Sequence, residues 1–417
     1  MVAVSTPLPA LGQRARTAAR ALATTPTDAK DAALHAAADL LVERAGDVVA
    51  ANRQDVERAE RSGTSAAVLD RLRLDTKRVG SMAAALREVA AQPDPVGTVV
   101  RGWVRPNGLR IEQVRVPLGV VAIIYENRPN VTSDAFGLCL KSGNAAFLRG
   151  SSAAISSNQA VAGILREGLS KAGLPEDALV LVEDTSRESA VEFMRLRGLI
   201  DVLIPRGGPS LIAAVLESAT VPYVLDGDGN CHVYVDAAAD LEMATAIVVN
   251  AKTQRPSVCN AAESLVVHAD VAEAFLPPLA RALDGVELVG DERARAIVPS
   301  MGSASEVDFA SEFLDLKLSV AVVGSIDEAI DHVRRYGTGH TEAIVTGDLH
   351  AADRFTAEVD AAAVVVNAST RWVDGERFGF GAEIGISTQK LHARGPMGLP
   401  ELTTAKYVVR GSGQIVV

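Results

Sequence analysis

Short apolar runs alternate with helical segments over most of the chain, and this alternation limits the possible folds more than any other feature. One set of runs lies within residues 120–225, and a second set lies within residues 232–366. Continuous short apolar runs are typical of strands that helices cover on both faces of a parallel sheet. The sequence therefore predicts an α/β fold with two parallel lobes. Their expected strands are VVAIIY, AAFLR, ALVLV, DVLIP and VPYVL in the first lobe, and HVYV, SLVVHA, SVAVVG, EAIVTG and AAVVVN in the second.

The N-terminal part of the chain has a different pattern. Residues 10–91 are rich in alanine, and their apolar residues recur at helical spacing, so we expect helices there. Breaks are expected at residues 24–28 and 61–65, with Asp28 and Thr64 as helix caps. This region carries no group that suggests chemistry, and we interpret it as a scaffold layer.

Two strand-like segments flank the predicted lobes. Residues 99–119 surround the turn PNG, and residues 406–417 surround GSG, so each is predicted to form a hairpin. A hairpin alone is only marginally stable in water. We therefore expect both hairpins to lie against another domain or subunit.

Composition excludes several classes of protein. The chain of 417 residues has a net charge of -11, which argues against a nucleic-acid-binding protein. The three cysteines match neither a disulfide framework nor a metal-ligand pattern, so no metal is expected. No apolar run is long enough to span a bilayer, and the N-terminal segment lacks the apolar core of a secretory signal. Reduced thiols and these absences together predict a cytoplasmic protein.

Cys259 is the strongest candidate for a catalytic group. Residues 241–254 are expected to form a helix that Pro256 ends, and the run ESLVV then begins a strand. A thiol in such a turn can face a cleft, and the nearby Lys252 and Arg255 would stabilise its thiolate, which is the nucleophilic form. The alternative is an inert core thiol. That alternative fits Cys139 well and Cys231 more loosely.

Two strand-to-helix turns are candidate phosphate sites. The stretch LRGSS places Arg149, Ser151 and Ser152 at the start of a predicted helix, and IPRGGPS places Gly207 and Gly208 in a similar position. Arg149 stands where NAD enzymes usually have an acid, so NADP is favoured over NAD. Neither stretch is a GxGxxG motif, and a turn with serine as cap is the alternative for both.

Other polar residues remain open at this level. In YENRPNVT, Asn130 either caps a helix or donates its amide to an oxyanion. His340 and His392 have no partner visible in the sequence, and both are expected to be structural.

Several motifs together resemble the gamma-glutamyl phosphate reductase family, a divergent branch of the aldehyde dehydrogenase superfamily. They are RPSVCN with AESLVV, YENRPNVTSDA, IPRGG, HTEAI, VNASTR and STQKLHARGPMGL, and residues 323–344 resemble the family's own signature. The resemblance extends nearly from end to end. It implies an aldehyde-dehydrogenase-like fold with two Rossmann-like lobes and a β-hairpin oligomerisation arm. The implied domains are a cofactor domain (residues 1–98 and 119–236), a catalytic domain (237–383) and the arm (99–118 and 394–417).

The resemblance also implies roles for individual residues. Cys259 and Asn130 correspond to the catalytic thiol and the oxyanion donor, and Glu312 corresponds to the acid that contacts the nicotinamide ribose. The residues Arg149, Ser151, Ser152, Arg206, Gly207 and Gly208 correspond to the rest of the NADPH site. Hydrolytic aldehyde dehydrogenases carry a glutamate before the thiol that activates water, whereas the matching turn here, LDGDGNCHVYVD, has none. That absence fits a reductase that accepts an acyl phosphate.

The predicted reaction is therefore the NADPH-dependent reduction of glutamyl 5-phosphate to glutamate 5-semialdehyde through a Cys259 thioester, in proline biosynthesis. Lys252 and Arg255 are predicted to hold the anionic substrate. A homodimer or higher homo-oligomer and a transient association with glutamate 5-kinase are the expected partners, with no nucleic acid and no membrane. The alternatives are an NAD(P)-dependent aldehyde dehydrogenase that acts oxidatively, a cysteine acyltransferase or hydrolase without nicotinamide, and a non-enzymatic scaffold.

Overall fold

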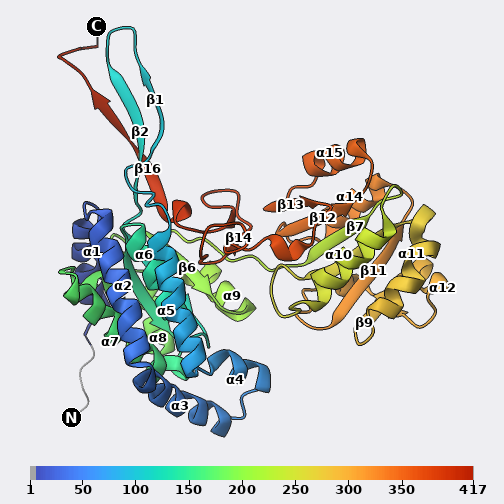
Figure 1. The fold of residues 1–417 in the computed structure, drawn as a ribbon, viewed down its shortest axis with the longest axis horizontal. Coiled ribbons are helices and arrows are strands. Elements are labelled where there is room, and N and C mark those ends of the chain that lie inside the picture. The colour runs from blue at the N-terminus through green and yellow to red at the C-terminus, as the bar shows by residue number, and fades with distance from the viewer. Residues whose placement is uncertain (1–5, 417) are drawn as a thin grey trace. The chain divides into compact units, whose positions relative to one another are not determined.

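The computed structural model describes residues 6–416, and these divide into two compact units. Unit 1 comprises residues 6–225, 379–385 and 397–416, and unit 2 comprises residues 226–378 and 386–396. Figure 1 shows the elements of each unit. No helix among the described residues has both the length and the apolar character needed to cross a membrane.

The predicted N-terminal helices are confirmed. They are α1 (Leu8–Leu22), α2 (Thr27–Glu43), α3 (Ala45–Arg61), α4 (Ala66–Leu72) and α5 (Thr76–Ala91). Many of their alanines and leucines, such as Leu34 and Ala37, are buried, which explains the helical spacing of apolar residues. The predicted caps are wrong, because Pro26 and Ser65 stand at the N-cap positions of α2 and α4. Asp28 lies inside the first turn of α2, where a carboxylate favours the helix dipole instead.

A four-stranded parallel sheet forms the centre of unit 1. Its order is β5-β4-β3-β6, and the strands β3 and β4 are entirely buried. The predicted run VPYVL does not become a strand, because only Tyr223 forms an isolated bridge with Leu203. The strands are β3 (Val120–Tyr125), β4 (Ala145–Gly150), β5 (Leu179–Leu181) and β6 (Val202–Arg206). The connecting helices are α6 (Val131–Lys141), η1 (Ser152–Ala154), α7 (Ile155–Lys171), η2 (Glu176–Ala178), α8 (Arg187–Phe193) and α9 (Pro209–Ser218).

Unit 1 also carries a three-stranded antiparallel sheet of order β1-β2-β16. The hairpin of β1 (Val99–Val104) and β2 (Arg110–Pro117) confirms the first predicted hairpin. The second predicted hairpin is wrong among the described residues, since β16 (Thr403–Arg410) pairs along the free edge of β2 (Figure 1). β2 is therefore paired with a neighbouring strand along both of its edges. The tail after β16 folds back instead, and Gln414 Nε2 donates to the Asn107 carbonyl at 2.8 Å.

A seven-stranded parallel sheet forms the centre of unit 2, in the order β10-β9-β11-β8-β7-β12-β13. All five predicted runs of this lobe are present, while β9 and β10 are short and were not predicted. The strands are β7 (Cys231–Val235), β8 (Ala262–His268), β9 (Glu287–Gly290), β10 (Gly302–Ser303), β11 (Lys317–Val323), β12 (Thr341–Val345) and β13 (Ala363–Val366).

Helices cover both faces of this sheet, as predicted. Alternate strand residues such as Val233 and Leu265 pack in one cluster with α10 and α11, and their neighbours Tyr234 and Val266 pack in another with α14 and α15. Figure 1 shows these helices in unit 2. The helices are α10 (Leu241–Thr253), α11 (Ala269–Ala282), α12 (Glu292–Ile297), α13 (Glu306–Phe309), α14 (Ile326–Tyr336), α15 (Leu349–Glu358) and η3 (Thr370–Trp372). The short elements β14 (Ile386–Ser387), β15 (Gly395–Pro396) and η4 (Pro400–Leu402) complete the chain.

Candidate active site

Cys259 lies in a turn between α10 and β8. Asp240 caps the start of α10 by accepting from the Glu242 and Met243 amides, and the helix ends at Thr253, with Gln254 as its C-cap two residues before Pro256. The thiol is partly exposed, whereas Cys139 and Cys231 are fully buried. Burial raises the pKa of both buried thiols, so neither is a ready nucleophile.

Neighbouring segments of unit 2 hold the Cys259 turn from two sides. Asn260 Nδ2 donates to the Val373 carbonyl, and Thr370 Oγ1 donates to the Asn260 carbonyl, both at 2.7 Å. On the other side, a Cβ on Gly229 would lie 1.6 Å from the Cys259 carbonyl oxygen, so only glycine fits there. Cys231 Sγ donates to the same carbonyl oxygen at 3.1 Å. The backbone that presents the thiol is therefore tightly positioned.

Lys252 does not lie on the surface of this site. Its side chain is fully buried, and Nζ lies 2.5 Å from Oε2 of the buried Glu263. Desolvation lowers the pKa of Lys252, and burial raises the pKa of Glu263 to about 7. The predicted contact of Lys252 with the substrate is therefore not supported, since the ammonium is held inside the protein. Arg255, the other predicted substrate residue, is exposed.

Arg371 is the basic residue that the structure brings to the Cys259 turn. It belongs to η3, is only 5% exposed, and donates from Nε to Gln254 Oε1 at 2.9 Å. Burial lowers the pKa of Arg371, and a negative charge on Cys259 raises it. The sequence places this arginine more than a hundred residues from the thiol, in VNASTR, and only that motif drew attention to it.

Glu312 lies beside the turn that lacks the water-activating glutamate. Its Oε1 accepts from the Gly229 amide at 2.8 Å, which joins the segment before β11 to the turn before β7. Burial raises the pKa of Glu312, and the nearby Asp228 and Asp226 raise it further. The residue is thus placed in unit 2 close to the Cys259 turn, rather than on a solvated surface.

The histidines are placed as structural residues. His340 is completely buried, and burial lowers its pKa to about 4, so its ring is neutral near pH 7. Its Nδ1 lies 2.8 Å from Thr341 Oγ1 and 3.7 Å from Cys231 Sγ. His392 is exposed. Neither is placed as the partner base of the Cys259 thiol.

Two asparagines follow β3 in unit 1. Asn130 is exposed, and its Nδ2 donates to Asp134 Oδ2 at 2.9 Å. Burial raises the pKa of Asp134 to about 6, and the positive charge of Arg206 opposes that shift. Asn127 was not predicted, yet its φ of 48° is in the left-handed region that a non-glycine residue seldom adopts. Such strained residues cluster at functional sites, so Asn127 joins Asn130 as a candidate donor.

The predicted turn after β4 is only partly available to a cofactor. Arg149 is buried, and its Nη2 donates to the Ser186 carbonyl at 2.6 Å, while Nε has no hydrogen-bond partner within residues 6–416. Ser151 Oγ contacts Asn127 at 3.4 Å, and Ser152 is exposed at the start of η1. The structure also brings Asp184 near Arg149, and this acid raises the pKa of the arginine against the lowering effect of burial. Sequence reasoning did not point to Asp184.

An acid that follows β3, Glu126, reaches the predicted turn after β6. Gly208 stands at the N-cap of α9, and its amide donates to Glu126 Oε2 at 3.2 Å. A Cβ on Gly207 would lie 2.6 Å from the same carboxylate oxygen. Arg206 ends β6, and its carbonyl accepts from the Glu126 amide at 3.1 Å. The Glu126 carboxylate thus already accepts from the Gly208 amide. A phosphate group that binds to this amide must displace the carboxylate.

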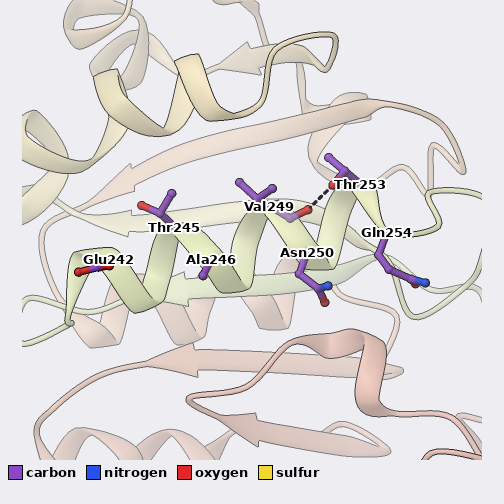
Figure 2. Close-up of a pocket in the computed structure, with 7 residues that line it drawn as sticks. All are labelled: Glu242, Thr245, Ala246, Val249, Asn250, Thr253 and Gln254. Carbon is purple, nitrogen blue, oxygen red and sulfur yellow. Dashed lines mark hydrogen bonds between the residues drawn. The ribbon is translucent and has the colours of Figure 1, made fainter.

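A separate hollow follows the outward face of α10 (Figure 2). Its volume is about 640 Å³, and its lining residues recur every three or four positions along this one helix. Figure 2 shows Thr245, Val249 and Thr253 in one row along the helix and Ala246, Asn250 and Gln254 in a second row, and a bond joins Thr253 Oγ1 to the Val249 carbonyl. The face offers no cluster of nucleophiles or paired acids. It is an uncovered helix surface rather than a second reaction site.

Comparisons with known proteins bear on the family of the chain rather than on single residues of the site. The model of the aldehyde dehydrogenase family matches residues 8–316. A gamma-glutamyl phosphate reductase from Moorella thermoacetica is 58% identical over 97% of both chains, and one from Thermobifida fusca is 57% identical over 97% of both. The crystal structure of a gamma-glutamyl phosphate reductase from Thermotoga maritima superposes with a TM-score of 0.96 at 48% identity, covering 98% of this chain and 99% of that one.

Proposed function

The chain belongs to the aldehyde dehydrogenase family and, within it, to the gamma-glutamyl phosphate reductases, and from this starting point we propose which residues carry out the reaction. The activity is the NADPH-dependent reduction of L-glutamyl 5-phosphate to L-glutamate 5-semialdehyde and phosphate, a step of proline biosynthesis. The 58% identity over nearly the whole chain carries this conclusion. The oxidative and the nicotinamide-free alternatives are not favoured.

Cys259 is the proposed nucleophile. Its thiolate attacks the γ-carbonyl carbon, a carbon–sulfur bond forms, and the bond from that carbon to the phosphate oxygen breaks. Phosphate leaves with the electron pair of that bond, and a thioester remains on Cys259. The acyl phosphate is already activated, so the step needs no strong base, and the neutral, buried His340 is consistent with that. A partly exposed thiol on a tightly held turn supports this role.

The oxyanion formed in this attack needs preorganised donors. We assign one donor to the Cys259 amide and the other to a side-chain amide that follows β3, for which Asn130 is the predicted residue and Asn127 the second candidate. One such donor is worth ~3 kcal/mol in the transition state. The bond from Asn130 to Asp134 and the strained backbone of Asn127 are the observations that separate the two.

The residues of unit 1 fit a nicotinamide dinucleotide, and this fit supports a cofactor domain within the predicted residues 1–98 and 119–236, although residues 226–236 belong to unit 2. The unpartnered Nε of Arg149 is a donor suited to a phosphate, and Ser151 and Ser152 lie beside it. A side chain on Gly207 would meet those of Glu126 and Leu211, and the Gly208 amide at the N-terminus of α9 becomes available to a phosphate once Glu126 is displaced. In unit 2, Glu312 is the proposed contact to the nicotinamide ribose. When bound, NADPH supplies the hydride that reduces the thioester.

The role of Cys259 has a direct test. Cys259→Ala should abolish reduction of NADP⁺ by the semialdehyde in the presence of phosphate, while NADPH binding, followed by fluorescence, stays nearly unchanged. Cys139→Ala is the matched control and should keep most of the activity, because its thiol is buried in α6 of unit 1. Cys231→Ala should also keep most of the activity, apart from any loss caused by removing its bond to the Cys259 carbonyl. Substantial turnover by the Cys259 variant would rule out the thioester route.

We propose that the protein is a homodimer or a higher homo-oligomer. The sheet of β1, β2 and β16 supports this, because it exposes large apolar side chains to water, and a partner subunit would bury them. They are Val99, Val100, Trp103, Val104, Tyr407 and Val409, each at least 40% exposed. This sheet matches most of the predicted arm, residues 99–118 and 394–417, although residues 394–396 belong to unit 2. The uncovered face of α10 is a second surface available to a partner subunit.

We also propose a cytoplasmic location and a transient association with glutamate 5-kinase. The substrate is a mixed anhydride that water hydrolyses, so direct transfer from the enzyme that makes it would limit its loss. Sedimentation of the two purified proteins together would support the association, and independent sedimentation at every ratio would contradict it.

A further inference from the structure

Arg371 carries a buried guanidinium whose hydrogen-bonding capacity is only partly used. Nε donates to Gln254, but Nη1 is buried and has no hydrogen-bond partner in the part of the chain that the structure describes. An arginine is charged at every physiological pH, and a buried donor without an acceptor is destabilising. Unsatisfied groups of this kind are rare in native proteins and call for an explanation. An anionic ligand at Nη1 provides one.

The fold fastens this guanidinium to the segment that carries the thiol. Gln254, the partner of Nε, is the last residue before the turn of Cys259. The segment that carries Arg371 is bonded to Asn260, since Thr370 Oγ1 donates to its carbonyl and the Val373 carbonyl accepts from its side-chain amide. One bond from Arg371 and two from its neighbours in the chain therefore fasten this segment to the Cys259 turn.

Two further arginines lie within electrostatic range. Arg255 and Arg377 both lower the pKa of Arg371, as like charges do, whereas Cys259 and Asp374 raise it. Arg377 lies over the exposed ring of Trp372 at 5.9 Å. The carboxylate of Asp374 is already engaged, because it accepts from the Glu376 and Arg377 amides. Arg371 thus lies within electrostatic range of two further cations and of Cys259, and this grouping of positive charge suits an anionic ligand.

We propose that Arg371, together with Arg255 and Arg377, binds the phosphate group of the acyl phosphate and stabilises it as it leaves. This inference rests on Cys259 as the nucleophile. The planar guanidinium fits two phosphate oxygens at once, which an ammonium group cannot do. As the thiolate sulfur bonds to the carbonyl carbon, the carbon–oxygen bond breaks and its electron pair stays on the phosphate. The guanidinium group stabilises the charge that develops there. The burial of Lys252 against Glu263 leaves this task to the arginines.

The reverse reaction measures the site through inorganic phosphate. Wild-type protein, NADP⁺ and glutamate 5-semialdehyde are titrated with phosphate, and Arg371→Met is expected to raise the phosphate KM at least about tenfold, because a charged hydrogen bond is lost. Arg371→Lys should fall between the two, since it keeps the charge and loses the fork. Arg354→Met is the matched control, because Arg354 pairs with Asp327 and Glu358 on the surface, and its phosphate KM should not change. A phosphate KM within about twofold of wild type in Arg371→Met would overturn the proposal.

A second readout separates phosphate binding from support of the thiolate. Iodoacetamide alkylates Cys259, and phosphate should protect the wild-type thiol but not the thiol of Arg371→Met. If that variant shifts the pH profile of alkylation but keeps its phosphate KM, Arg371 supports only the thiolate and the phosphate site is refuted. Should Arg371→Met fail to fold, the proposal is tested with Arg255→Met and Arg377→Met, because both arginines are exposed. Each variant is expected to raise the phosphate KM at least about threefold. No change in either would overturn the cluster. A wild type that needs no phosphate to reduce NADP⁺ would instead contradict the reaction itself.

Discussion

At the scale of single residues, the oxyanion donor is the sharpest open choice. Asn130 gives one amide hydrogen to Asp134, while Asn127 has a φ of 48° that favours a functional reason for its presence. We expect Asn127→Ala to lower kcat by about 10²–10³-fold, the typical effect of removing one oxyanion donor. Asn130→Ala should lower it less than about tenfold, because only a hydrogen bond to Asp134 is lost. Steady-state kinetics with phosphate-saturated enzyme measures both.

A third variant separates chemistry from backbone strain in that comparison. Asn127→Gly also removes the amide, but glycine adopts positive φ without strain. If the amide matters, the glycine variant is as slow as the alanine variant while its melting temperature is higher. Activity near wild type in Asn127→Gly would show that the loss of kcat in Asn127→Ala comes from backbone strain and not from the missing amide. The reverse ranking of Asn127 and Asn130 would return the role to Asn130.

The residue scale also shows what the sequence could and could not predict. Cys259 was predictable, because a proline-terminated helix followed by a strand places a thiol in a turn. Lys252 was misplaced, because a lysine seven residues from the thiol can point into the core when an acid such as Glu263 is there to pair with it. Arg371 could not be predicted from spacing, since only the folded chain joins it to Gln254.

At the scale of elements, the turn before β7 controls where the Cys259 carbonyl lies. A Cβ on Gly229 would meet that oxygen at 1.6 Å, and the oxygen cannot yield freely because Asn260 is held on its other side. We expect Gly229→Ala to displace the thiol and to lower kcat/KM by about 10²-fold, the usual cost of a shift near 1 Å. The alkylation rate of Cys259 should change as well.

Gly80→Ala is the matched control for that substitution. A Cβ there meets nothing within 4 Å, and the residue lies inside α5, so alanine should stabilise the helix by about 0.5–1 kcal/mol without affecting turnover. Thermal unfolding and steady-state kinetics of both variants provide the comparison. Normal turnover in Gly229→Ala would mean that the turn adapts to the methyl group without moving the thiol.

Elements were predicted well where their own sequence determines them. The buried strands of both parallel sheets follow from continuous apolar runs, and β3 and β8 match their predicted positions closely. The tail was predicted wrongly, because its strand-like residues are compatible with a hairpin and with a third strand alike. The choice depends on the free edge of β2, which lies about three hundred residues away in the sequence and becomes available only in the folded unit.

At the scale of the whole molecule, the described chain leaves apolar surface that one copy does not cover. The β1–β2–β16 sheet exposes Trp103 at 40%, Val104 at 64% and Tyr407 at 55%, with Arg101 over the Trp103 ring at 5.7 Å. A free, apolar edge strand is an aggregation hazard that native proteins avoid. A closed two-fold assembly would bury this surface and leave no open edge. The sequence predicted the arm as a partner surface, and this remains a prediction.

The tail beyond β16 provides the test of that assembly. Gln414 anchors the tail to the hairpin turn through Asn107, and it presents Ile415 at 80% exposure for a partner to cover. Deleting residues 411–417 removes both the anchor and the apolar side chain, so we expect the oligomer to dissociate at concentrations where the full chain remains assembled. The substitution Ile415→Ser keeps the anchor and removes only the apolar contact, so it should weaken the assembly less than the deletion. Light scattering over a dilution series measures the mass of each protein. An unchanged mass for the deletion at every concentration would exclude the tail from the interface, and an equal loss in both variants would assign the effect to Ile415 alone.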